Sequence, residues 1–142
     1  MRAAALLFIL VIPGGDTSFE YRVAVSYHAK LVKNREWSIA VYRTGRKMRI
    51  AVDNFGSRSI VAPLEKGEYL ALVDFLNRKG IWRLRDHYPP GSPNAFYKIE
   101  VESEGRRHSA VVEAGPLLSG YASRYREIIR RMENLAKIKL DG

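Results

Sequence analysis

The chain of 142 residues contains no cysteine. This absence excludes disulfide bonds, a cysteine nucleophile, thiolate zinc sites and a lipidated cysteine near the N-terminus. It does not decide the compartment, because an exported domain of this size can be stable without disulfides when its core is large enough. The 46% hydrophobic and 27% charged fractions are typical of a globular protein, so folded structure is expected.

Local motifs of enzymes are also missing. The sequence has no phosphate-binding G-x-x-x-x-G-K-[ST] or G-x-G-x-x-G motif and no serine in a G-x-S-x-G elbow. The three histidines, His28, His87 and His108, lack the spacing of a metal-binding pair, and His28 and His108 are expected on polar faces of strands. His87 next to Asp86 in a loop offers a general base, but adjacent residues rarely orient one another in that way. We therefore expect no enzymatic activity, no metal and no cofactor, and no small-molecule substrate is indicated.

Only one long apolar run is present, and it lies at the N-terminus. Residues 1–12 read MRAAALLFILVI and are followed by Pro-Gly-Gly-Asp. The run is shorter than the roughly 20 residues of a spanning helix, and it has the charged and apolar regions of a secretory signal. We expect residues 1–15 to be a signal peptide or a short hydrophobic segment and residues 16–142 to form a single α+β domain, exported to the periplasm or the exterior. The alternative is a buried first strand of a cytosolic fold.

Positive charge exceeds negative charge in the sequence as a whole. Lys and Arg number 24 against 15 for Asp and Glu, a formal net charge of +9, and 16 of the cations are arginine. Arginine suits planar, bidentate contact with carboxylate or phosphate. An acidic protein surface is the expected partner, an anionic membrane surface is an alternative, and nucleic acid is a third.

Six stretches have strand character, four of them with the two-residue alternation of a half-buried strand. Short turns at Thr44-Gly45 and Glu104-Gly105 join four of these stretches into two hairpins. Asp86–Asn94, with three prolines, is expected to be a loop without regular structure. The expected strands are residues 20–28, 37–42, 47–52, 59–64, 97–102 and 108–113.

Two stretches have helical periodicity. Within residues 64–85, apolar residues recur at the i, i+3, i+4, i+7 spacing from Tyr69 to Leu76, and Gly80 is placed to end the helix. A second amphipathic helix is expected from about Ser119 to Lys137, with a mostly basic outer face. The prediction is an α+β fold in which an antiparallel sheet of five or six strands is covered on one face by two helices.

The candidate binding residues are exposed cations at the turns and on the last helix, together with two aromatic residues beside the proline-rich loop. They would pair with an acidic protein or envelope partner, so that the chain would act as a non-catalytic binding or accessory module. These residues are Arg43, Arg46, Lys47, Arg106, Arg107, Arg126, Arg130, Trp82 and Tyr88.

Two alternative functions are left open. A cytosolic nucleic-acid-binding domain would use basic clusters with stacking aromatic residues, and one such cluster, which includes Arg78, Lys79, Arg83 and Arg85, follows the first helix. The element order, a strand-rich start with two helices, resembles small bacterial protease-inhibitor modules such as emfourin. This resemblance concerns the fold alone and implies an inhibitor-like module without assigning any residue.

Overall fold

The computed structural model describes residues 20–29, 35–87, 95–114 and 123–142. The expected signal peptide over residues 1–15 and the candidate Tyr88 lie outside these ranges. Among the helices within them, none is long and apolar enough to cross a membrane.

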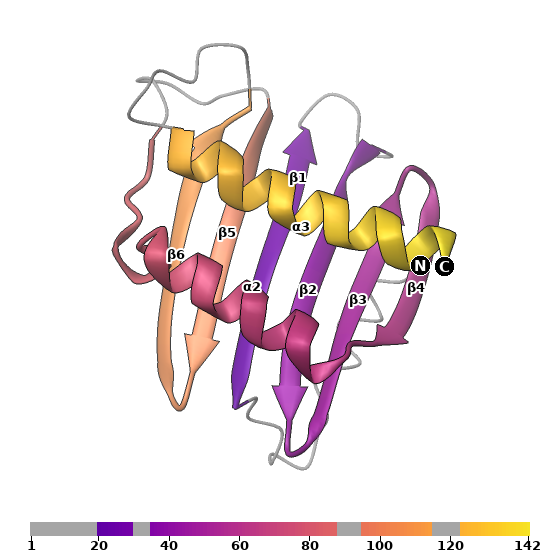
Figure 1. The fold of residues 1–142 in the computed structure, drawn as a ribbon. Helices are drawn as coiled ribbons and strands as arrows, with labels where there is room; N and C mark the ends of the chain where they lie inside the picture. The colour runs from indigo at the N-terminus through magenta and orange to yellow at the C-terminus, as the bar shows by residue number, and fades with distance from the viewer. Residues whose placement is uncertain (1–19, 30–34, 88–94, 115–122) are drawn as a thin grey trace.

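The sheet has six strands in the order β4-β3-β2-β1-β5-β6, and every neighbouring pair is antiparallel (Figure 1). The two predicted hairpins are β2–β3 and β5–β6, each closed by a two-residue turn. The strands are β1 (Tyr21–Ala29), β2 (Trp37–Thr44), β3 (Lys47–Phe55), β4 (Arg58–Pro63), β5 (Ala95–Ser103) and β6 (Arg106–Glu113).

The strand register collects the apolar residues on one face of the sheet. Val25 of β1 pairs with Ile39 of β2 and with Ile99 of β5, and Ile39 pairs in turn with Val52 of β3. All four side chains are buried. Because side chains alternate between the two faces of a strand, this register forms one continuous apolar floor for the helices.

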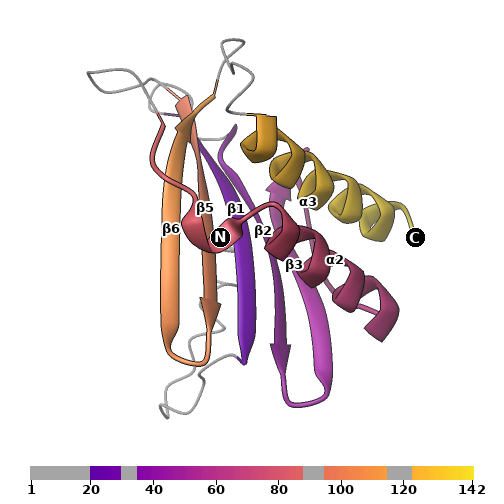
Figure 2. The same cartoon turned by 60° about the vertical axis from the view of Figure 1, so that its left-hand side comes forward.

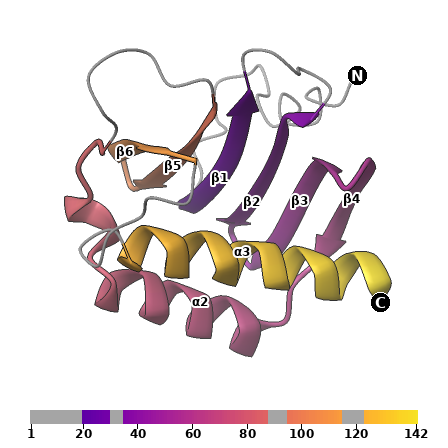
Figure 3. The ribbon, with the colours of Figure 1, turned by 90° about the horizontal axis from the view of Figure 1, so that it is seen from above.

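Both helices lie across that face, which confirms the predicted α+β arrangement (Figures 1 and 2). The view from above separates the helical layer from the sheet (Figure 3). Helix α2 (Lys66–Arg78) leads into a short 3-10 turn, η2 (Ile81–Arg83), and helix α3 (Ser123–Asp141) closes the chain. The helices run antiparallel, since Lys139 of α3 meets Glu68 near the start of α2 whereas Lys79 at the end of α2 meets Glu127 near the start of α3.

Some details differ from the sequence-based expectations. Helix α3 continues to Asp141, where Arg58 of β4 donates hydrogen bonds to the Asp141 carboxylate and the Leu140 carbonyl, so it does not end at Lys137. The expected residues 119–122 at its start lie outside the described ranges. The prediction for His108 was wrong, because its pairing with Val101 places it on the helix-covered face. There its Nε2–H donates to the Leu84 carbonyl at 2.6 Å.

The expected loop that begins at Asp86 contains more order than predicted. The backbone of His87 forms a short parallel bridge with Val112 on the outer edge of β6. Its N–H donates to the Val111 carbonyl at 2.7 Å, and its carbonyl accepts from Glu113 at 2.9 Å. The Asp86 carboxylate accepts from the Val111 N–H at 2.9 Å. These bonds cover part of an edge that would otherwise be open to pairing with another chain.

The contact between the two helices predicts a pH-dependent contribution to stability. Hydrogen bonds to Glu68, first from Lys139 and then from the Glu65 backbone, hold the pKa of the Glu68 carboxyl below its usual value of 4.5. A lowered pKa contributes stability above the unfolded value, and that stability is lost as pH falls through the folded value. Glu68→Gln should therefore lower the free energy of unfolding by about 0.5 to 1 kcal/mol near pH 7, and the difference should vanish near pH 3.

Urea unfolding at both pH values measures this effect. The matched control is Asp74→Asn, which removes an exposed ion pair with Arg78 within the same helix and should change little. An equal loss for Glu68→Gln at both pH values would contradict the electrostatic origin.

Candidate anion-binding hollow

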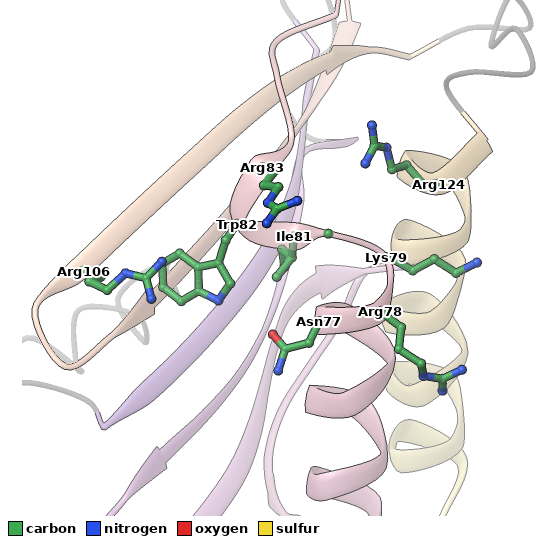
Figure 4. Close-up of a pocket in the computed structure, with 9 residues that line it drawn as sticks. Asn77, Arg78, Lys79, Ile81, Trp82, Arg83, Arg106 and Arg124 are labelled. Carbon is green, nitrogen blue, oxygen red and sulfur yellow. The ribbon is translucent and has the colours of Figure 1, made fainter.

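A surface hollow of about 660 Å³ lies where α2 ends and the chain turns through η2. Its walls come from four places: the end of α2, η2, the β5–β6 hairpin and the first turn of α3 (Figure 4). Five of the lining side chains are cations, and none is a carboxylate; the cations are Arg78, Lys79, Arg83, Arg106 and Arg124. We call this site the arginine hollow.

Two of these cations are neutralised locally. Arg78 donates to the Asp74 carboxylate at 3.0 Å, and Lys79 pairs with Glu127 of α3. Within the described ranges, Arg83, Arg106 and Arg124 form no ion pair with any carboxylate. Like charges in a recess reinforce one another's potential, so the hollow has an excess of positive charge and of N–H donors.

Trp82 and Arg106 form the aromatic part of the wall. The guanidinium carbon of Arg106 lies 4.2 Å from the centroid of the Trp82 ring, within cation–π range. The sequence positions of these two residues are far apart, and the β5–β6 hairpin brings Arg106 to the indole (Figure 4). A guanidinium stacked on a ring is restrained in orientation, while its in-plane N–H groups remain available to an anion.

The segment after α2 is held so that its polar side chains face the hollow. Ile81 and Leu84 are buried in the core, which fixes the backbone between them. Tyr125 of α3 fixes the following residue, because its hydroxyl donates to the Arg85 carbonyl at 2.8 Å and accepts from the Arg85 N–H at 3.3 Å. Trp82 and Arg83, between these anchors, line the hollow.

The first turn of α3 carries positive side chains, which the helix dipole disfavours. A helix N-terminus carries partial positive charge and favours acidic residues, as α2 illustrates with the capping pair Glu65 and Glu68. The first turn of α3 contains no acid and includes Arg124 and Arg126. Departures from a local preference, such as that for acidic residues at a helix N-terminus, are expected at functional sites.

Gly80 allows the chain to turn below Arg124. Its φ of +72° is the left-handed conformation predicted for the residue after a helix, and a Cβ built there would lie 3.2 Å from the Arg124 Nη1. Gly80→Ala should therefore lower the free energy of unfolding by about 1 to 2 kcal/mol. Thermal or urea unfolding measures the loss.

The matched control for this change is Gly67→Ala. Gly67 lies inside α2, and an added Cβ there meets nothing within 4 Å. Alanine is the better helix former, so this substitution should raise the free energy of unfolding by about 0.5 to 1 kcal/mol. Equal effects of the two substitutions would contradict the role of the left-handed turn.

The structure places two of the sequence-predicted site residues, Trp82 and Arg106, together in the arginine hollow. The other candidates within the described ranges lie elsewhere. Arg107 is exposed on the face of the sheet opposite the helices, with its Nε 3.8 Å from Glu102, and it lines a hollow of about 610 Å³ that also contains Glu100 and Arg22. That hollow has both signs of charge.

Arg43 and Arg46 line a smaller hollow of about 330 Å³ near the start of α2. Arg43 donates to Glu20 at 2.7 Å, and this hydrogen bond is the main reason why the pKa of the Glu20 carboxyl is lowered. Lys47 is exposed at the β2–β3 turn. It lines neither this smaller hollow nor the arginine hollow.

The two candidates on α3 lie outside the arginine hollow. Arg130 is exposed, as expected, whereas Arg126 is half-buried and is less exposed than its expected place on the outer face of the helix implied. Glu133, on the same side of the helix, is also half-buried, and burial raises the pKa of its carboxyl. This side of α3 therefore approaches the sheet more closely than the charge pattern indicated.

Arg124 was missed by the sequence analysis. The available signal was the run of cations without an acid at the start of an amphipathic helix, which the helix dipole disfavours. Among the described residues, no cluster of histidine and carboxylate side chains is suited to a metal ion.

No protein-family model matches the chain, and no curated protein matches it either.

Proposed function

We propose that this protein is a non-catalytic binding module that holds a polyanionic partner in the arginine hollow. One observation carries the proposal: Arg83, Arg106 and Arg124 converge from three separate elements without a carboxylate partner among the described residues. Gathering like charges costs free energy, and an anionic partner offsets that cost on binding.

The chemistry of the hollow supports binding in preference to catalysis. Its lining contributes guanidinium, ammonium and amide donors, an indole ring and an aliphatic side chain. Groups of this kind bind and orient an oxyanion. The amine among them, Lys79, is paired with Glu127, and the described lining contributes no hydroxyl, imidazole, thiol or carboxylate for nucleophilic or acid–base catalysis.

The proposal that the protein is exported depends on the sequence alone. We infer export from the apolar run over residues 1–12, which has the charged and apolar regions of a secretory signal. Cell fractionation with mass spectrometry of the N-terminus tests it: a mature chain starting near residue 16 supports export, and an intact N-terminus in the cytosol contradicts it.

Binding itself can be tested with the full chain and three polyanions: polyglutamate, a single-stranded oligonucleotide and vesicles containing anionic lipid. At least one should bind, with an affinity that falls steeply between about 50 and 200 mM salt. Absence of binding to all three at low salt would contradict the proposed function.

A further inference from the structure

We infer that the ligand of the arginine hollow is a nucleotide, free or within a single strand, whose base contacts the Trp82–Arg106 pair and whose phosphate is held by Arg83 and Arg124. The inference rests on the proposed function and narrows the polyanion to one chemical class. Four features of the hollow support it.

The first feature is a planar platform. The guanidinium of Arg106 lies over the half-buried indole of Trp82, 4.2 Å from the ring centroid, so the pair offers a planar cation backed by an aromatic ring. Every nucleobase has a π-face, so such a surface accepts bases of any identity by stacking and cation–π contact.

The second feature is the position of the phosphate donors relative to this platform. Arg83 directly follows Trp82 in η2, and Arg124 faces the same hollow from the first turn of α3. A nucleotide carries its phosphate a short distance from its base, which matches donors placed beside the platform. The forked guanidinium donors suit the several oxygens of one phosphate.

The third feature is the size of the hollow. Its volume of about 660 Å³ lies in the range of roughly 300 to 1,000 Å³ found for small-molecule sites. A compact ligand of nucleotide size fits that range, and a longer strand can extend from the open side.

The fourth feature argues against an acidic protein surface. Protein interfaces usually have an apolar centre that is depleted of charge, whereas nucleic-acid interfaces are much more polar and positively charged. Five of the nine residues that line the arginine hollow are cations. The large exposed hydrophobic residues of the described chain, Val61, Leu70 and Ile138, line no part of it.

The test compares five probes on the full chain: oligothymidine of about ten nucleotides, an abasic strand of the same length, thymidine monophosphate, inorganic phosphate and polyglutamate. In a Trp37→Phe background, Trp82 is the only indole, so quenching of its fluorescence reports binding at the Trp82–Arg106 pair. Oligothymidine should quench Trp82 and bind more tightly than the abasic strand and polyglutamate. Quenching by the monophosphate at similar concentrations assigns the site to a free nucleotide, and quenching by the strand alone assigns it to single-stranded nucleic acid.

Variants are compared by the anisotropy of labelled oligothymidine. Trp82→Ala should weaken binding of oligothymidine by about 5- to 100-fold and should weaken binding of the abasic strand much less. Trp82→Phe retains an aromatic ring and should bind nearly as the parent does, which separates loss of stacking from loss of folding.

Two outcomes are decisive and distinguishable. If polyglutamate and oligothymidine bind with equal affinity, and Trp82→Ala changes both affinities or neither, the nucleotide inference is overturned. The proposal of a binding module is then unaffected. Failure of every probe to bind overturns the proposed function itself.

Discussion

Replacing Leu76 by alanine is expected to lower the free energy of unfolding by about 3 to 5 kcal/mol. Leu76 is 0% exposed on the inner face of α2 and belongs to the core between the helices and the sheet. Truncation removes apolar contacts and leaves a cavity that rigid neighbours cannot fill. Since small domains are stable by only about 5 to 15 kcal/mol, the loss is a large fraction of the total.

Urea unfolding followed by far-UV circular dichroism measures this loss. The control is Leu70→Ala in the same helix, where the side chain is 50% exposed and the same truncation should cost less than about 1 kcal/mol. Similar costs at the two positions would contradict the placement of α2 on the sheet.

The double substitution Arg83→Ala/Arg124→Ala is expected to weaken polyanion binding by about 100-fold or more. A hydrogen bond to a charged group contributes roughly 1.5 to 3 kcal/mol, and neither arginine has a described carboxylate partner that would compete with the ligand. For a single-stranded ligand, the slope of log affinity against log salt should become shallower by about 1.4, because two phosphate contacts are lost.

Titration at several salt concentrations measures both quantities. The control, Arg35→Ala/Lys137→Ala, removes the same net charge at exposed positions outside the hollow and should change affinity only slightly. An equal loss in the control would show that binding depends on net charge alone. Folding of the Arg83/Arg124 variant should not suffer, since the change removes unpaired like charges.

Most of the fold follows from local patterns in the sequence. The two-residue alternation around Val25, Ile39 and Ile99 predicts strands with one buried face, and the register joins these faces into one floor. Gly80 predicts the end of α2 because a left-handed residue after a helix favours glycine. Such features depend on neighbours along the chain and are therefore readable from it.

Features set by distant contacts were harder to predict. His108 was assigned to the wrong face because β6 carries valine on both faces, at Val111 and Val112, so that alternation alone does not determine its orientation. The stacking of Arg106 on Trp82 and the approach of Arg124 to Gly80 depend on tertiary packing of separate elements. The sequence indicated basic clusters but not which cations converge without carboxylate partners.

The most direct test of the arginine hollow is the change in backbone amide chemical shifts of the ¹⁵N-labelled chain during titration with oligothymidine. Shifts should concentrate on residues 77–83, with Arg106 and Arg124, which the fold brings together around one site. Perturbations confined instead to the opposite face of the sheet, around Arg22 and Arg107, would contradict the assignment of the hollow as the binding site.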